Sequence, residues 1–200
     1  NNLPQELYFD QVGVAYATMY SKVLTLKVFN LPFRKLFTED DELSSLRTIL
    51  SYRADTILLS GYSGLASYNP ITGETSWIRK TETEAWLDAI KLSPDTLLTS
   101  SHASVLKRCN SSGDVFQTIP KADPGRSFLT IYTLFENSSG QIWLGTSAGL
   151  ATYQSGDDHY QFCTEINKVG ALGRSSIRHI TEQNNRLWLA TNKGLYSLHT

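Results

Sequence analysis

The residues that could perform chemistry are scattered along the chain. The four histidines, His102, His159, His179 and His199, fall in different predicted elements, and none has the short spacing to Cys, Asp or another His that is typical of a metal site. The acidic run at residues 39–42 could supply carboxylates to calcium, or it could be a solvated connection between strands. The sequence shows no recognisable pair of catalytic carboxylates and no nucleophile beside a base. We therefore predict no catalytic residues, no metal site and no cofactor.

The elements that must position any site are defined by an internal repeat. Four segments align, at residues 55–65, 95–105, 140–150 and 185–195. Their third residues, Ile57, Leu97, Ile142 and Leu187, follow one another at intervals of 40, 45 and 45 residues. This period is typical of β-propeller blades with four strands each.

Each repeat has the same order of strands and turns. First strands are predicted at residues 46–50, 86–90, 131–135 and 177–181. The aligned segment is the second strand, and it ends in a tight turn at Gly64, Gly149 or Gly194, where glycine can adopt a positive φ. Third strands are predicted at residues 65–68, 105–109, 150–153 and 195–198, and outer strands at 75–78 and 115–119. Because these runs are short and rich in β-branched and aromatic residues, they predict an all-β fold of four-stranded antiparallel blades.

The two ends of the chain do not complete one shared blade. Residues 1–37 are predicted to be a degenerate or truncated blade, with a second strand at 12–18, a third at 23–29 and a fourth at 33–37. Residues 38–200 then hold the blades of one domain, at approximately 38–80, 81–120, 121–167 and 168–200. We predict an arc of about four to five blades from a larger propeller, with a closed small ring as the alternative. An open arc exposes an apolar blade face at each end, so we expect self-association as a dimer.

The composition is that of an ordinary globular protein. Hydrophobic residues make up 40% and charged residues 18%, and the formal net charge is -1, so the chain can bury a core. Scattered Lys and Arg give no basic stripe, which argues against nucleic acid as a partner. No apolar run approaches the roughly 18 residues that span a bilayer, and no signal peptide is visible. The chain begins at Asn1, which we interpret as a processed chain or a piece of a longer one.

The two cysteines, Cys109 and Cys163, fit neither a zinc pattern nor a disulfide framework. Two separate, partly buried thiols are the first interpretation. A single disulfide between them is the alternative.

Two of the aligned segments resemble a known repeat. Residues 140–150 read Gly-Gln-Ile-Trp-Leu-Gly-Thr-Ser-Ala-Gly-Leu, and residues 186–195 read Arg-Leu-Trp-Leu-Ala-Thr-Asn-Lys-Gly-Leu. Both are similar to the two-component regulator propeller repeat, Gly-x-Ile-Trp-Ile-Gly-Thr-x-x-Gly-Leu, and residues 37–46 resemble the connection between blades in that family. The resemblance covers residues 37–200. It weakens at Leu58, which replaces Trp, and at Ser101, His102 and Ser104, which replace the usual Thr and Gly.

The resemblance implies the extracytoplasmic sensor region of a hybrid two-component histidine kinase. Related proteins carry two large propellers outside the inner membrane, followed by a β-sandwich, a membrane helix and a kinase, and many detect oligosaccharides. By this resemblance the chain would be a non-catalytic, periplasmic, ligand-sensing propeller of an inner-membrane receptor. Its ligand would be an oligosaccharide or another small molecule, and only flanking segments would reach the membrane. Because propellers host many functions, a protein-interaction scaffold and a propeller lyase or glycosidase stay open as alternatives.

One end of the blades is the predicted binding face. In a four-stranded meander, the turn after the second strand and the connection after the fourth emerge at the same end, where loops on a rigid scaffold commonly carry binding. That end would present Tyr62, His102, Arg126, Lys168, Arg174 and Lys193, together with Glu82 and Glu84. This mixture of charge with an aromatic ring suits a polar or anionic ligand.

Tryptophans could add a sugar-stacking platform. Trp143 and Trp188 occupy the same position of the repeat, in the middle of a strand. Because this position recurs with the blade, we expect both side chains to pack between blades. Trp77 and Trp86 are likewise expected to belong to the core.

Overall fold

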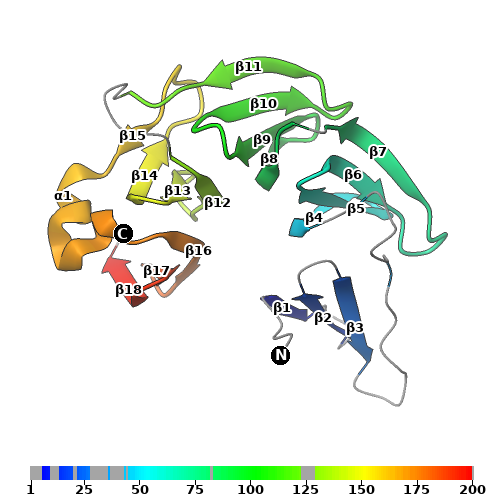
Figure 1. The fold of residues 1–200 in the computed structure, drawn as a ribbon, viewed down its shortest axis with the longest axis horizontal. Helices are drawn as coiled ribbons and strands as arrows, with labels where there is room; N and C mark the ends of the chain where they lie inside the picture. Colours follow the sequence, from blue (N-terminus) through cyan, green and yellow to red (C-terminus); the bar gives the residue numbers. More distant parts are fainter. Residues whose placement is uncertain are drawn as a thin grey trace.

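The structure is an arc of small antiparallel sheets. The computed structural model describes residues 6–9, 14–19, 22–27, 36, 43, 45–81, 83–122 and 129–199. These residues form five sheets, of which three have four strands and the first and last have three. The sheets follow one another around an open arc, with the first and last sheets on the two sides of its opening (Figure 1). The predicted all-β architecture of propeller blades in an arc is therefore confirmed.

The elements along the chain are as follows. The first sheet contains β1 (Glu6–Phe9), β2 (Val14–Met19) and β3 (Lys22–Lys27). The second contains β4 (Leu46–Arg53), β5 (Thr56–Gly61), β6 (Gly64–Tyr68) and β7 (Thr75–Lys80). The third contains β8 (Trp86–Ser93), β9 (Thr96–Ser101), β10 (Leu106–Asn110) and β11 (Val115–Ile119). The fourth contains β12 (Ile131–Glu136), β13 (Ile142–Thr146), β14 (Gly149–Tyr153) and β15 (Gln161–Phe162). A helical segment of α1 (Thr164–Lys168) and η1 (Val169–Arg174) follows it. The fifth sheet contains β16 (Ile177–Gln183), β17 (Arg186–Thr191) and β18 (Gly194–His199).

Each sheet is a meander in which every strand pairs with its neighbour along the chain. The first strands β4, β8, β12 and β16 lie toward the inside of the arc, and β7 and β11 lie on its outside (Figure 1). The predicted turn glycines Gly64, Gly149 and Gly194 have φ values of 121°, 100° and 124°. At Gly64 an added Cβ would lie 2.0 Å from the carbonyl oxygen of Arg79, so the turn also needs a residue without a side chain.

Three details differ from the sequence prediction. β1 pairs with β2, although no strand was expected before residue 12. The third strand of the third sheet begins at Leu106 and not at Val105, because the β9–β10 turn is one residue longer than the β5–β6 turn. A helical segment follows β15, where only β structure was expected. The predicted strand at residues 33–37 falls outside the described residues apart from Leu36.

The hydrophobic core lies between neighbouring sheets. Leu58 and Leu65 of the second sheet pack with Trp86 and Leu97 of the third. Equivalent clusters join the third sheet to the fourth and the fourth to the fifth. A strand covered on both faces does not need to alternate apolar with polar residues, which explains the continuous apolar run at the start of β13.

A buried carboxylate ties three sheets together near the inside of the arc. Asp88 on β8 is 9% exposed. Its Oδ1 accepts a hydrogen bond from the Thr48 hydroxyl on β4 at 2.7 Å, and its Oδ2 accepts one from the Leu134 amide on β12 at 2.7 Å. Burial raises the pKa of Asp88, and these hydrogen bonds oppose the shift. One side chain therefore fixes the spacing of the second, third and fourth sheets.

Candidate functional site

One end of the sheets gathers turns and bulges from four successive sheets. At this end, each of the first strands β4, β8, β12 and β16 shifts its pairing register with the second strand of its sheet. The bulged residues are Arg47, Leu87, Tyr132 and Arg178. A bulge re-aims the side chain of its extra residue. Polar and aromatic side chains from this end of the sheets form what we call the inner rim: Arg47, Tyr62, His102, Thr130, Tyr132 and Arg178.

The first part of the inner rim is a chain of contacts across three sheets. The Arg47 guanidinium lies 5.0 Å from the centre of the Tyr62 ring and donates to the Tyr62 hydroxyl at 3.3 Å. The same hydroxyl lies 3.2 Å from Nε2 of His102, and Nδ1 of His102 lies 3.3 Å from the Thr130 hydroxyl. The Tyr62 and His102 rings meet edge to face, with centroids 5.6 Å apart. The β5–β6 turn, the β9–β10 turn and the segment before β12 are therefore linked by polar side chains.

The second part of the inner rim joins the fourth and fifth sheets. The Arg178 guanidinium lies 3.8 Å from the centre of the Tyr132 ring, which is the distance of a stacked pair. Both residues occupy the bulge position of their inner strands. The Arg178 side chain is exposed, and Tyr132 is half-buried beneath it.

Electrostatics at the inner rim keep its histidine neutral. Burial, followed by repulsion from Arg47, lowers the pKa of His102 from its ordinary value of 6.5. Since both ring nitrogens face hydroxyl groups, which donate and accept equally well, either tautomer satisfies this site. The charge of the rim at neutral pH therefore comes from its two arginines.

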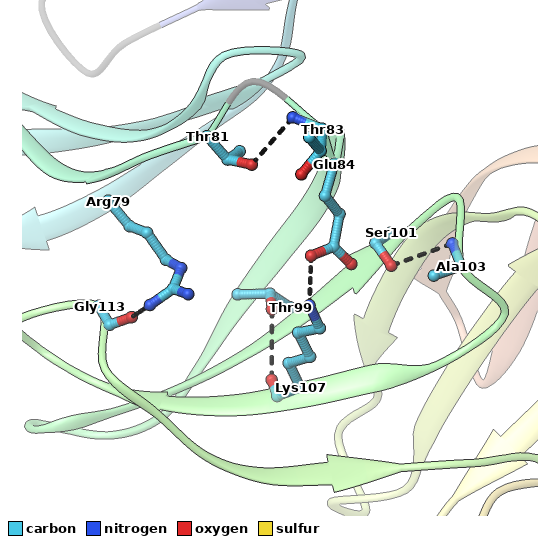
Figure 2. Close-up of polar contacts among 9 residues, drawn as sticks. All are labelled: Arg79, Thr81, Thr83, Glu84, Thr99, Ser101, Ala103, Lys107 and Gly113. Atoms are coloured by element: carbon cyan, nitrogen blue, oxygen red, sulfur yellow. Dashed lines mark hydrogen bonds and ion pairs between the residues drawn. The ribbon is translucent and has the colours of Figure 1, made fainter.

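A second polar cluster joins the second and third sheets, and Figure 2 shows its contacts. Lys107 on β10 forms an ion pair with Glu84, and Arg79 on β7 donates to the carbonyl oxygen of Gly113 at 3.1 Å. The Lys107 ammonium and the Arg79 guanidinium lie 5.6 and 5.8 Å from the centre of the buried Trp86 ring. Because these charges have partners and the indole is covered, the cluster holds two sheets together.

The structure brings two of the predicted site residues into contact and places three others on the helical segment and the last hairpin. Tyr62 and His102 are in contact at the inner rim. Lys168 ends α1 and pairs with Glu165 at 2.7 Å, Arg174 is exposed at the end of η1, and Lys193 is exposed in the β17–β18 turn. Arg126 and Glu82 lie outside the described residues, as does the acidic run at residues 39–42.

Sequence reasoning missed four members of the inner rim. Arg47, Tyr132 and Arg178 are each the second residue of a predicted first strand, so the repeat alignment already placed them in one column. What it could not show is the bulge that turns this column toward the rim. Thr130 precedes β12, in a connection with no repeat signal.

The tryptophans and cysteines take structural positions. Trp86 is 1% exposed, and Trp143 packs against the core between the fourth and fifth sheets, as predicted. Cys109 and Cys163 are separate free thiols, also as predicted, and burial raises the pKa of each to about 11. Within the described part of the chain, no cluster of three His, Cys, Asp or Glu side chains could hold a metal ion. No helix among the described residues has the length and apolar character needed to cross a membrane.

Comparison with known proteins identifies the fold. No protein-family model matches the chain, and no curated protein matches it. Among solved structures, it resembles the extracellular domain of BT3049 from B. thetaiotaomicron, assigned as a hybrid two component system, with a TM-score of 0.73 and 18% identity over 98% of this chain and 27% of that one. The extracellular domain of BT4673 from the same organism, assigned as a one component system, gives a TM-score of 0.72 and 16% identity over 98% of this chain and 27% of that one.

A propeller enzyme shares the fold more distantly. Virginiamycin B lyase from Staphylococcus aureus gives a TM-score of 0.64 with 9% identity, over 100% of this chain and 72% of the lyase. The chain therefore spans about a quarter of the receptor ectodomains that it resembles and most of the length of the enzyme. At these identities the likeness establishes the propeller fold.

Proposed function

We propose that this chain is part of the extracytoplasmic sensor of a two-component receptor and that it binds an oligosaccharide without converting it. The observation that carries the proposal is the inner rim, where Tyr62 contacts both Arg47 of its own sheet and His102 of the next sheet. An aromatic ring bordered by hydrogen-bond donors and acceptors is suited to a sugar, which has an apolar face and a polar edge. The fold of the receptor ectodomains supports the same function.

Signalling requires that the ligand favour one arrangement of the receptor. A ligand that spans side chains from neighbouring sheets has a different affinity for arrangements in which those sheets are spaced differently. A ligand with equal affinity for both arrangements would transmit nothing. The inner rim offers a ligand side chains from neighbouring sheets, because its contacts run from the second sheet to the fourth.

Thermal unfolding against a panel of neutral and acidic oligosaccharides tests the proposal, with turnover followed in the same wells. A ligand that binds only the folded chain must raise the melting temperature. We expect a shift without product, and we expect Tyr62→Ala to abolish it. No shift with any saccharide would contradict the proposal and favour a protein-interaction scaffold.

A lyase is the second candidate, because the inner rim also contains a pair that could transfer protons. His102 Nε2 lies 3.2 Å from the Tyr62 hydroxyl, and a His–Tyr pair can serve as general base and acid. The virginiamycin B lyase shows that this fold supports an enzyme. Product formation that disappears in His102→Ala and in Tyr62→Phe would replace the sensor proposal with this one.

We further propose that the chain self-associates through the last sheet. Leu195 on β18, beside the β17–β18 turn, is 67% exposed, whereas its repeat equivalent Leu150 is 0% exposed and packs against the fifth sheet. An open propeller end therefore leaves apolar surface that a second copy of the chain can cover. Sedimentation velocity should show dimers for the unmodified chain and monomers for Leu195→Asp. A compact monomer at all concentrations would contradict the dimer.

A further inference from the structure

The two arginines of the inner rim are built alike. Arg47 and Arg178 both occupy the bulge position of an inner strand, both side chains are exposed, and each guanidinium lies over a tyrosine ring, at 5.0 Å for Tyr62 and 3.8 Å for Tyr132. Stacking on a ring restricts the side chain, which reduces the conformational entropy lost when a ligand binds.

Stacking also leaves the edges of both guanidinium groups available. A guanidinium carries five N–H donors in its own plane, and contact with a ring covers the face of that plane. Arg47 uses one nitrogen on the Tyr62 hydroxyl, at 3.3 Å. The remaining donors form the fork that pairs with the two oxygens of a carboxylate or a sulfate group.

Three acidic side chains of the described residues near this end already have partners. Glu84 pairs with Lys107, and Glu165 pairs with Lys168. The Asp88 carboxylate is buried and accepts hydrogen bonds from Thr48, Ala89 and Leu134. Among the described residues these carboxylates therefore have partners other than Arg47 and Arg178.

The inner rim carries positive charge, although the protein as a whole does not. The formal net charge of the protein is -1, so long-range attraction does not draw anions to it. Affinity for an anion must come from donors held at one place. At the second sheet the inner rim supplies the guanidinium of Arg47, which contacts Tyr62, and at the fifth sheet it supplies the guanidinium of Arg178 over Tyr132. The imidazole of His102, beside Tyr62, gains a proton more readily once an anion lies next to it.

We propose that the ligand of the inner rim is an acidic saccharide, whose carboxylate or sulfate groups are bound by Arg47 and Arg178. The inference rests on the proposed sensor function and adds the chemical class of the ligand. Tyr62, which contacts Arg47, and His102, which contacts Tyr62, would contact the sugar ring and its hydroxyls. A neutral saccharide of the same size would leave both guanidinium forks unpaired.

Matched pairs of probes separate this inference from the function on which it rests. Calorimetry would compare galacturonic-acid oligomers with galactose oligomers, and sulfated with unsulfated N-acetyllactosamine, with sodium acetate and sodium sulfate as free-ion controls. We expect the acidic member of one pair to bind at least about 10-fold more tightly than its neutral partner, which is the loss of one charge-assisted hydrogen bond. The preferred pair distinguishes a carboxylate from a sulfate ester.

Variants locate the effect. Arg47→Ala and Arg178→Ala should each weaken the acidic probe by about 10-fold or more. The matched control is Arg53→Ala, because Arg53 lies 5.1 Å from the centre of the Tyr52 ring in the same strand as Arg47 but at its opposite end. That variant should bind normally, and circular dichroism would confirm that all three variants fold.

Four other results would each contradict at least one part of the proposal. Equal binding of neutral and acidic partners would overturn the acidic class and leave the sensor function standing. Binding of the free ions as tightly as the acidic saccharides would overturn the saccharide part. Unchanged affinity of the acidic probe for Arg47→Ala and Arg178→Ala would place the site elsewhere. No binding by any probe would overturn both the inference and the sensor proposal.

Discussion

Two hairpins of nearly the same sequence meet different surroundings. The β13–β14 hairpin contains Ile-Trp-Leu-Gly-Thr-Ser-Ala-Gly-Leu, and the β17–β18 hairpin contains Leu-Trp-Leu-Ala-Thr-Asn-Lys-Gly-Leu. Leu150 and Leu195 end these segments, and each lies opposite the small residue of its partner strand. Leu150 is 0% exposed, whereas Leu195 is 67% exposed.

The neighbouring sheet makes this difference. Leu150 packs against Ile177, Ile180 and Leu187 of the fifth sheet, whereas Ala190 and Leu195 on the equivalent face of the fifth sheet are exposed. The same contrast separates Thr133, which is 5% exposed, from the exposed His179 at the equivalent position of β16. A propeller repeat therefore encodes a face for a neighbour and does not bury that face by itself.

The largest expected effect is the difference in free energy of unfolding between Leu150→Ala and Leu195→Ala. Removing the buried Leu150 side chain should lower the free energy of unfolding by about 3 kcal/mol, because the cavity lies inside a packed interface. Removing Leu195 should change it by less than about 0.5 kcal/mol in the monomer, since the side chain is largely exposed. Urea denaturation of both variants, at concentrations where the chain is monomeric, measures the difference. Equal losses would show that the two faces are equally covered.

A smaller effect concerns the residue opposite each leucine. An added Cβ at Gly145 would lie 2.5 Å from Cγ2 of Thr133 and 2.9 Å from Cγ2 of Ile177. We expect Gly145→Ala to cost about 1–3 kcal/mol through overpacking between the fourth and fifth sheets.

The control for that variant is Ala190→Ser, at the equivalent position of β17, which is exposed. The added hydroxyl meets no covering sheet, so the melting temperature should stay within about 2 °C of that of the unmodified chain. A Gly145→Ala variant as stable as the unmodified chain would mean that the sheets separate easily.

The repeat predicted the sheets well and the inner rim only in part. Strand positions follow from turn glycines and apolar runs, which are local, so predicted and observed strands agree except near the N-terminus, at the β9–β10 turn and after β15. Tyr62 and His102 were predicted because turns of one end must converge. The bulges that bring in Arg47, Tyr132 and Arg178 depend on how two strands pair with each other, and an alignment of repeats compares single segments and does not show that pairing.

The smallest expected effect depends on pH and concerns Asp88, which shares its repeat position with Thr48, Thr133 and His179. Burial raises the pKa of Asp88 above its ordinary value of 3.8. Below that value the carboxyl is protonated in both the folded and the unfolded chain, and it adds no pH dependence. As the pH rises through 3.8, the unfolded chain loses this proton first, so folding becomes less favourable until the folded carboxyl ionises as well.

Asp88→Asn isolates this contribution, because an amide does not titrate there and all other carboxyls cancel in the comparison. The free energy of unfolding of the unmodified chain should fall relative to that of Asp88→Asn as the pH rises from about 3 to 7, by about 1.4 kcal/mol for each unit of difference between the folded and unfolded pKa. Urea denaturation at several pH values gives the two curves. Curves that run parallel would mean that Asp88 ionises equally in both states. A free energy of unfolding that rises with pH for the unmodified chain, relative to Asp88→Asn, would mean that the hydrogen bonds with Thr48 and Leu134 outweigh burial.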